Sequence, residues 1–293
     1  MAAWGRTVNP VSRPALRYHG GKFRLAKWIM QFFPPHLIYT EAFGDAAGVL
    51  LQKPRCHGEV YNDLDEEMVS FFRCLQSPVL RDQLVQACTF TPYARSEFEL
   101  AWEPSQDIVE RARRTCIRAQ MGFGSAGATK GTTGLRIDTV KQYSTAQMDW
   151  AAYPPVLFDV ASRFQGVLIE NRTAVEVLLQ HDCEETLHYV DPPYVHSSRS
   201  LRGNGGYRHE MTDDDHAQLL EVLRNLEGMV VLSGYATALY QDALKGWQMH
   251  STPSRISAGR GAGVRTEVAW LNPACTAALD HSFGGLFSQE TTC

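Results

Sequence analysis

The amino-acid sequence predicts an α/β fold with a parallel sheet that is interrupted by one inserted region. Strand-like and helix-like segments alternate between residues 36 and 88, and the alternation resumes between residues 166 and 273. Such alternation is typical of a parallel sheet whose strands are joined by helices. Between Ser77 and Pro155 the pattern changes to helical pieces and a stretch rich in Gly and Thr. We therefore expect sheet-forming elements on both sides of an insertion.

The first part of the sheet is expected before residue 77. A strand over 37–40 leads to a turn at Phe43-Gly44, after which Ala, Val and Leu residues indicate the start of a helix. The segment 58–65 is predicted to be a second strand that ends in acids and an Asn. Helical spacing of apolar residues follows over 68–76 and 80–88.

The insertion and the second part of the sheet follow in chain order. Within the insertion, residues 105–123 are predicted to be helical and residues 124–138 to form a polar tip. The later strands are predicted over 166–171, 186–190, 229–235 and 265–273, and the helices between them over 174–182, 213–228 and 238–246. Residues 281–293 are expected to form a loose tail.

The composition is that of a globular protein with one large domain, or one domain with an insertion. The chain has 293 residues, of which 44% are hydrophobic and 20% charged. Its seven cysteines include no C-x-x-C pair, and its ten histidines show no H-x-E or H-E-x-x-H spacing, so neither a disulfide framework nor a metal site is expected. The apolar stretches stop short of the roughly 18 residues that a membrane span needs, and the N-terminus lacks a signal-peptide core. The expected location is the cytoplasm.

Basic residues gather in local clusters although the formal net charge is −4. The clusters lie within residues 13–27, 111–118, 199–208 and 255–265. Local patches on an acidic protein can hold a polyanion. Such clusters are also typical of the solvated faces of helices, so the charge pattern by itself leaves both interpretations open.

Two motifs follow the first two predicted strands, and ligands of open α/β sheets bind at the carboxyl ends of strands. In "EAFGDAAGVLL" (41–51), Gly44 lets a ligand approach the backbone, although a tight strand-to-helix turn explains the glycine equally well. In "NDLD" (62–65), an acid is placed to accept hydrogen bonds from the ribose hydroxyls of an adenosine-containing cofactor. Alternatively, Asp63 or Asp65 is the N-cap of the next helix.

A third motif, "RYHGGK" (17–22), lies near the N-terminus. Its two glycines offer exposed N–H groups and Lys22 offers an ammonium, which together suit a small carboxylate or phosphate. Taken alone, the motif is equally typical of a surface turn.

The most specific motif is "YVDPPY" (189–194), which comes directly after a predicted strand. Asp191 supplies a carboxylate acceptor, and Pro192 supplies a carbonyl whose orientation is fixed by Pro193. Two acceptors that face an exocyclic aromatic amine draw the nitrogen lone pair out of ring conjugation and make the nitrogen nucleophilic. Tyr194 would stack on the ring. The motif therefore predicts a site that activates an exocyclic aromatic amine, although a strand end closed by two prolines would also explain these residues.

Together these motifs resemble the Dam-like DNA adenine-N6 methyltransferases, especially the compact phage and prophage members. The order GGK, FG, NDLD, insertion, DPPY covers nearly the whole chain, and residues 207–235 and 265–273 also look like that subgroup. The resemblance implies an S-adenosylmethionine-dependent enzyme on a Rossmann-like sheet with helices on both faces. It implies a catalytic, cofactor-binding domain over residues 1–76 and 155–293, and a mainly helical target-recognition region over residues 77–154.

The resemblance also implies a role for individual residues and a partner, double-stranded DNA, on which a monomer suffices for a single-base reaction. The residues expected to grip the flipped adenine, and so to be catalytic, are Asp191, Pro192, Pro193 and Tyr194. The residues expected to bind the cofactor are Tyr18, Gly20, Gly21, Lys22, Phe43, Gly44, Asp63, Asn171 and Asp191. The residues expected to contact DNA are Arg114, Arg118, Lys130, Arg136, Arg199 and Arg202.

Two positions depart from the usual pattern of the family. Asp45 replaces a small residue, where it would either crowd the cofactor carboxylate or cap the following helix. Thr173 lies near the place of an Asp that contacts the cofactor's adenine, and either Asn171 or Thr173 would substitute for it. The departures motivate one alternative function, a catalytically impaired DNA-binding protein of the same fold.

A second alternative is transfer to cytosine N4, which also needs an activated exocyclic amine. Those enzymes usually present a Ser where Asp191 stands, so the acid favours adenine. An RNA substrate, the recognition sequence and the biological role stay open. That role would be protection of phage DNA, partnership with a nuclease, or regulation of transcription.

Overall fold

The structure is a computed structural model that describes residues 11–124, 133–137, 145–195, 208–258 and 261–287. The described chain forms two compact units, each assembled from separate stretches of sequence. The first unit contains residues 11–26, 45–55 and 65–169, and the second contains residues 27–44, 56–64 and 170–287.

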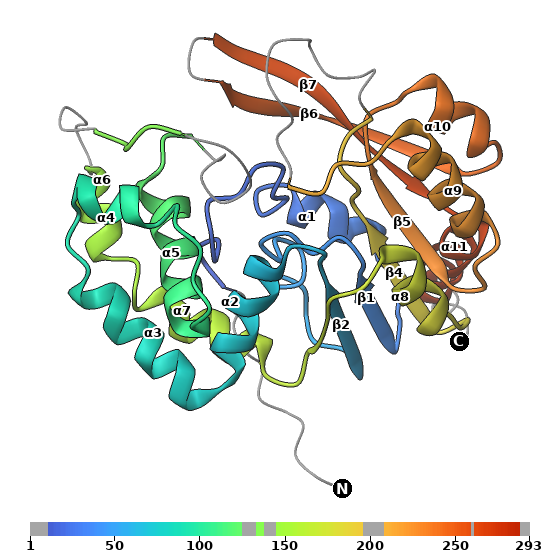
Figure 1. Cartoon of the computed structure of the whole chain (residues 1–293). Coiled ribbons are helices and arrows are strands. Elements are labelled where there is room, and N and C mark those ends of the chain that lie inside the picture. The colour runs from blue at the N-terminus through green and yellow to red at the C-terminus, as the bar shows by residue number, and fades with distance from the viewer. Residues whose placement is uncertain (1–10, 125–132, 138–144, 196–207, 259–260, 288–293) are drawn as a thin grey trace, which may run out of the picture. The chain divides into compact units, whose positions relative to one another are not determined.

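The first unit is mainly helical (Figure 1). Its helices are α2 (Glu66–Gln76), α3 (Pro78–Phe90), α4 (Arg95–Leu100), α5 (Ile108–Met121), α6 (Ala146–Ala151) and α7 (Val156–Phe164). Helix α2 packs against α3, α5 and α7. Its Phe72 is fully buried and stacks on Phe164, with ring centroids 4.1 Å apart. The expected helices over 68–76, 80–88 and 105–123 are confirmed by α2, α3 and α5.

The second unit carries a seven-stranded sheet, and β3 crosses the boundary between the units. The strands are β1 (Ile38–Glu41), β2 (Gly58–Asn62), β3 (Leu168–Glu170), β4 (Thr186–Val190), β5 (Met229–Gly234), β6 (Gln248–Ala258) and β7 (Gly261–Leu271). Their spatial order is β3-β2-β1-β4-β5-β7-β6. Strand β1 lies parallel to β2 and β4, and β4 lies parallel to β5, so the chain leaves all four at the same edge of the sheet.

The sheet is mixed rather than wholly parallel. Strand β7 runs antiparallel to β5 and forms a long antiparallel pair with β6. Residues 265–273 were expected to form a strand, whereas β6 has no counterpart among the predicted strands. Strand β6 lies at the edge of the sheet, which is where a strand tolerates a residue without an N–H group such as Pro253.

Helices pack on both faces of the sheet, as the resemblance implies. On one face, α8 (Ala174–Gln180), α9 (Asp213–Arg224) and α10 (Ala238–Ala243) bury apolar side chains against Val190 and Leu232. On the other face, Phe33 packs against Tyr39 and Tyr189. The helices α1 (Ala26–Ile29), η1 (Met30–Phe32) and α11 (Pro273–Phe287) belong to this side, where the Cys275 thiol lies 3.4 Å from the Phe32 carbonyl oxygen.

Two local predictions are wrong. The helix expected after Gly44 does not form, because residues 45–53 run as successive turns in which Asp45 and Ala47 have positive φ angles of 48° and 54°. The loose tail expected from residue 281 is not found over residues 281–287, where α11 continues to Phe287. Residues 288–293 lie outside the described chain.

Candidate active site

The "DPPY" motif lies at the carboxyl end of β4, in the second unit. Every residue of β4 is buried, and Asp191 follows its last residue directly. The neighbouring strands β1 and β5 are parallel to β4, so the segments that follow them leave at the same edge. A buried strand thus delivers an acid and an aromatic ring to the edge where open α/β sheets bind their ligands.

Asp191 is held by a chain of buried hydrogen bonds. The side chain of Asp191 is 9% exposed, and its Oδ1 accepts a hydrogen bond of 2.7 Å from the hydroxyl of Ser233 in β5. The Ser233 oxygen lies 3.0 Å from the Tyr189 hydroxyl. Hydrogen bonds to an ionised acceptor are stronger than neutral ones, so this arrangement fixes the orientation of the Asp191 carboxyl group.

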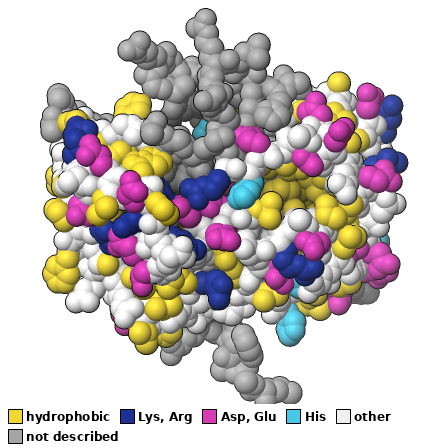
Figure 2. Space-filling view, in the orientation of Figure 1, with side chains coloured by type: hydrophobic (Ala, Val, Ile, Leu, Met, Phe, Trp, Pro, Cys, Tyr) yellow, Lys and Arg dark blue, Asp and Glu magenta, His cyan; other side chains and the backbone are white. Residues whose placement is uncertain are grey.

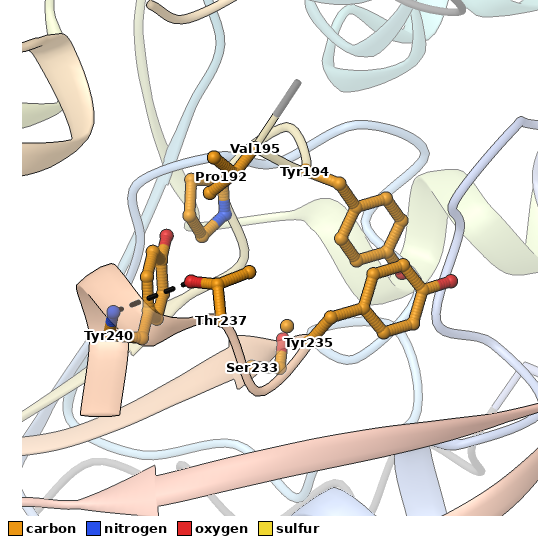
Figure 3. A pocket seen from close by; sticks show the side chains of 8 residues that line it. Pro192, Tyr194, Val195, Ser233, Tyr235, Thr237 and Tyr240 are labelled. Carbon is orange, nitrogen blue, oxygen red and sulfur yellow. Dashed lines mark hydrogen bonds between the residues drawn. The ribbon is translucent and has the colours of Figure 1, made fainter. Parts of the chain in front are cut away.

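A hollow opens beside Asp191 between the segments that follow β4 and β5 (Figure 3). Its lining residues are Pro192, Tyr194, Val195, Ser233, Gly234, Tyr235, Thr237 and Tyr240. The space between these atoms amounts to about 200 Å³, part of it open to solvent. Its lining includes the rings of Tyr194, Tyr235 and Tyr240, and aromatic rings are suited to contact another flat ring.

Tyr194 forms an aromatic wall of the hollow together with Tyr235. The two rings are stacked, with centroids 4.1 Å apart and planes 17° apart, and Figure 3 shows them face to face. The Tyr194 hydroxyl lies 3.4 Å from both carboxylate oxygens of Glu267, which is 2% exposed. Stacking on one face and a carboxylate at the hydroxyl together restrict the orientation of the Tyr194 ring.

Tyr240 closes the inner side of the hollow. Its hydroxyl lies 3.0 Å from Nδ1 of the buried His216. Burial, with the negative charge of Asp191 as a second cause, raises the pKa of Tyr240 above its ordinary value. Tyr240 is therefore a neutral phenol at physiological pH, and it adds no second negative charge beside the Asp191 carboxylate.

Gly44 follows β1 and is held by close packing. Its N–H donates a hydrogen bond of 2.8 Å to the Asn62 carbonyl, and a Cβ atom at Gly44 would lie 2.2 Å from Cε2 of Tyr61. The missing side chain therefore makes room for the buried Tyr61 ring. The neighbouring Phe43 is partly buried against the apolar core of the second unit.

The alternatives at "NDLD" are resolved in favour of Asp65 as the cap. The Asp65 carboxylate accepts a hydrogen bond from the Glu67 N–H at the start of α2. Asp63 follows β2 at the same edge as Gly44, and its carbonyl accepts a hydrogen bond of 2.7 Å from the Asn171 side-chain amide. The structure thus brings two of the expected cofactor residues, Asp63 and Asn171, into direct contact.

The two departures from the family pattern differ in their local structure. Asp45 caps no helix, since none follows it, and its backbone has the left-handed conformation given above. Thr173 is the N-cap of α8, where it forms a capping box with Glu176. The Thr173 hydroxyl is engaged in that cap, and the Asn171 side-chain amide is engaged with the Asp63 carbonyl.

The glycine motif near the N-terminus belongs to the first unit. Gly20 has a φ angle of 78°, and the Gly21 N–H lies 3.4 Å from the Tyr18 carbonyl oxygen. Lys22 is 5% exposed, and its ammonium donates to the Gly20 carbonyl. The Lys22 ammonium is thus folded back onto its own turn.

Two arginines expected to contact DNA are engaged within the first unit. Arg114 binds the Glu110 carboxylate and the carbonyl oxygens of Glu103 and Pro104. Arg118 is 4% exposed, forms an ion pair with Glu67 and donates to the Ala101 carbonyl. These contacts support a structural role for both arginines. On the face shown in Figure 2, most Lys and Arg side chains likewise lie beside acidic ones.

Arg136, another expected DNA contact, has a different environment. It forms an ion pair with Asp149 and lies close to Arg17. Burial lowers the pKa of Arg17, and the positive charge of Arg136 lowers it further. The buried Nη1 of Arg17 and Nε of Arg136 have no hydrogen-bond partner within the described chain. Lys130, Arg199 and Arg202 lie outside the described residues.

Several residues of the site were not assigned a role from the sequence: Ser233, Tyr235, Thr237, Tyr240 and Glu267. The observation that would have identified Ser233 as a site residue is the pairing of β4 with β5 in parallel register. Tyr189 pairs with Val231, and the residues two positions further along each strand, Asp191 and Ser233, point to the same face. A single sequence does not show this register.

Among the residues that the structure describes, no group of three or more His, Cys, Asp and Glu side chains is arranged to hold a metal ion. Nor does any helix within these ranges have the length and apolar character to cross a membrane.

Comparison with known proteins identifies the family. Residues 111–256 match the family model described as D12 class N6 adenine-specific DNA methyltransferase. The matched region runs from α5 into β6 and includes the "DPPY" motif and the residues that line the hollow. No curated protein matches the chain at a significant level. The match and the Rossmann-like sheet agree, and the chain belongs to the D12 class of N6 adenine-specific DNA methyltransferases, enzymes that methylate adenine in DNA.

Proposed function

We propose that this enzyme transfers a methyl group from S-adenosylmethionine to N6 of an adenine that has been turned out of duplex DNA. The observation that carries the proposal is the hollow at the carboxyl ends of β4 and β5. Its aromatic wall, Tyr194 and Tyr235, stands beside a carboxylate held in place by Ser233. A base inside a duplex cannot reach such a hollow, so the target nucleotide must leave the stack, at a cost of a few kcal/mol.

The residues that follow β1, β2 and β3 suit the cofactor. Asp63 is not the cap of α2, and its position after β2 matches that of an acid that binds ribose hydroxyls. Asn171 is tied to the Asp63 backbone, and Phe43 adds an apolar surface. When bound, S-adenosylmethionine supplies an electrophilic methyl group on a positively charged sulfur. We infer that Phe43, Gly44, Asp63 and Asn171 take part in holding it.

The chain's own contribution to the reaction is orientation of the base and activation of its amine. The adenine amine donates one N–H to the Asp191 carboxylate and the other to the Pro192 carbonyl. Pro193 restricts the backbone and so fixes the orientation of that carbonyl. This pair of acceptors makes the nitrogen more nucleophilic, and Tyr194 keeps the ring in place by stacking. Positioning two reactants and excluding water can supply several kcal/mol of the barrier reduction. The activation therefore needs neither a metal ion nor a covalent bond to the enzyme.

The proposal is tested by product analysis with three proteins: the parent, Asp191→Asn and the control Asp242→Asn. Asp242 is an exposed acid of α10 that pairs with Lys245. Each protein is incubated with unmethylated duplex DNA and labelled S-adenosylmethionine, and the DNA is digested to nucleosides for mass analysis. We expect N6-methyladenine from the parent and the control, and at least roughly 100-fold less from Asp191→Asn, since one lost transition-state contact typically costs that much.

Other results of this assay would contradict the proposal in distinguishable ways. Labelled N4-methylcytosine would overturn the choice of base. DNA binding without any labelled product would describe the alternative, a binding protein that has lost catalysis. Methylated RNA with unmodified DNA in a competition between the two substrates would overturn the choice of nucleic acid.

We also propose that residues 77–154 contribute to DNA recognition, and that Arg136 contacts a phosphate. The support is the pair of neighbouring guanidinium groups of Arg17 and Arg136, both of which have buried donors without a partner in the described chain. A phosphate contact contributes about one unit to the slope of log affinity against log salt concentration. Arg136→Ala should lower that slope by about one in DNA-binding titrations, whereas an unchanged slope would refute the contact.

As an enzyme acting on DNA, the protein would work in the cytoplasm of a bacterial or phage-infected cell.

A further inference from the structure

Ser233 and Tyr189 form a relay that ends on the Asp191 carboxylate. A carboxylate can only accept, so the Ser233 hydroxyl must donate its proton to Oδ1 of Asp191 across 2.7 Å. With that proton committed, the Ser233 oxygen must act as acceptor for the Tyr189 hydroxyl, which lies 3.0 Å away. The direction of both bonds therefore follows from the chemistry of the acid.

The relay is buried along its whole length. Ser233 and Tyr189 are 0% and 1% exposed, respectively. In such surroundings water does not compete for the hydrogen bonds, and a donor that bonds to a charged group is held more firmly than at the surface. A carboxylate has about four acceptor positions, so the bond from Ser233 orients Asp191 and still permits it to accept from an amine.

The relay also follows from the construction of the sheet. Tyr189 and Asp191 are two positions apart on the chain that forms β4, and Ser233 lies in β5, which is hydrogen-bonded to β4 in parallel register. All three side chains thus project to one side of two rigid, neighbouring strands. Sites built on strands hold their geometry more closely than sites built on loops. Asp191 itself lies just beyond β4, where it gains this support through Ser233.

We infer that Ser233 is a positioning residue for methyl transfer, that it acts by holding Asp191 toward the target amine, and that Tyr189 acts through Ser233. This inference rests on the proposed function. Near-attack geometry is sensitive to small displacements, so a misdirected carboxylate should slow the chemical step and leave the binding of DNA and cofactor largely intact.

The test is a double-mutant cycle on the full chain with Ser233→Ala, Tyr189→Phe and the double variant, read as single-turnover rates of N6-methyladenine formation. Loss of a hydrogen bond to a charged group corresponds to about a 10- to 100-fold slower transfer, and loss of a neutral one to about a 2- to 10-fold slower transfer. We expect these ranges for Ser233→Ala and Tyr189→Phe, respectively, with KM values for DNA and cofactor within about threefold of the parent. Because Tyr189 acts through Ser233, the double variant should be no slower than Ser233→Ala.

Further variants separate positioning from a merely structural effect. Ser233→Thr keeps the hydroxyl and should restore most of the rate. Ser70→Ala removes a buried hydroxyl that accepts from Arg111 in the first unit, and it should leave the rate within about twofold of the parent. Thermal unfolding of each variant shows whether the fold is kept, and Tyr189→Phe decides the matter if Ser233→Ala does not fold.

Two outcomes would overturn the inference while leaving the proposed function intact. One is a Ser233→Ala rate within twofold of the parent. The other is a full additional loss when Tyr189→Phe is combined with Ser233→Ala, because that would show that Tyr189 does not act through Ser233. A parent protein that forms no N6-methyladenine in the same assay would instead refute the proposed function, and the inference would fail with it.

Discussion

At the scale of single residues, Gly44 illustrates a position whose identity is explained by the packing of a neighbour. The sequence interpretation linked this glycine to close approach of a ligand or to a tight turn. In the structure a side chain there would overlap three ring atoms of Tyr61, at 2.2 to 2.7 Å, and the Tyr61 ring is fully buried. Close packing of an aromatic ring against backbone accounts for the glycine without any reference to the cofactor.

This packing makes a specific prediction. Gly44→Ala should destabilise the protein by roughly 1–3 kcal/mol, because the buried Tyr61 ring can move only by disturbing its other neighbours. Gly58→Ala is the matched control, since a Cβ there would meet Ile38 at an ordinary 3.7 Å. Urea denaturation followed by fluorescence would measure both free energies of unfolding. Equal stability of the two variants would contradict the packing argument.

Other residue-level predictions show what a sequence reveals and what it leaves open. The residue types at the end of β4 indicated an acceptor and a stacking ring, and the structure places Asp191 and Tyr194 beside a hollow. The family resemblance assigned Lys22 to the cofactor and Arg118 to DNA, and in the structure both side chains are buried. Charge is visible in a sequence, but the partner that neutralises it depends on tertiary contacts.

At the scale of elements, helix α8 begins with a capping box that Thr173 and Glu176 form. Thr173 accepts from the Glu176 N–H and donates to its carboxylate. These bonds lower the pKa of Glu176, which keeps the carboxylate charged at the positive end of the helix. The position that departs from the family pattern thus has a clear role in helix formation.

Replacement of this cap should destabilise the protein to different extents for two substitutions. Thr173→Ala removes the side-chain acceptor and should cost about 1 kcal/mol of stability, whereas Thr173→Asp keeps an acceptor and should cost much less. Thr89→Ala is a suitable control, because Thr89 lies inside α3 and its exposed hydroxyl bonds to the preceding turn at Val85. Thermal or urea unfolding measures all three. If Thr173→Asp were as destabilising as Thr173→Ala, the capping explanation would be wrong.

The central strands of the sheet were predicted correctly. Strands β4 and β5 are buried throughout and were recognised from runs of apolar residues. Strand β6 was missed because Pro253 and three Ser residues resemble a turn, and its place at the edge of the sheet is what permits the proline. The turns after Gly44 were mistaken for a helix because small apolar residues suit both.

At the scale of the whole molecule, the sheet register assembles the site from distant parts of the chain. The relay from Tyr189 to Asp191 includes Ser233, which lies 42 residues after Asp191. In the aromatic wall, Tyr194 stacks on Tyr235, and its hydroxyl lies beside the carboxylate of Glu267. Periodicity identifies each strand but not its neighbour, so these contacts could not be predicted from one sequence. The fold class was predicted from the sequence and the family resemblance, whereas the pairing of the strands is known only from the structure.

A second long-range network runs through the same sheet and centres on His188 of β4. His188 is fully buried; its Nδ1 lies 2.8 Å from the Thr40 hydroxyl and its Nε2 lies 3.1 Å from the Asp182 carboxylate. Since the carboxylate can only accept, Nε2 carries the proton and Nδ1 accepts from Thr40 in the neutral ring. Burial lowers the pKa of His188, and this effect outweighs the opposing attraction of Asp182.

The lowered pKa of His188 makes protein stability depend on pH with a definite sign. Between the folded-state pKa and the ordinary value of about 6.5, the unfolded chain binds more protons, so the free energy of unfolding rises with pH. The contribution of His188 is therefore complete above about pH 6.5 and is lost as the pH falls through the folded-state pKa. Urea unfolding between pH 5 and 8 should show this loss in the parent and a flatter dependence in His188→Gln. Burial also lowers the pKa of His181, so His181→Gln should flatten the curve in the same sense. A parent-like slope in His188→Gln would mean that the buried ring is not what makes the protein less stable in acid.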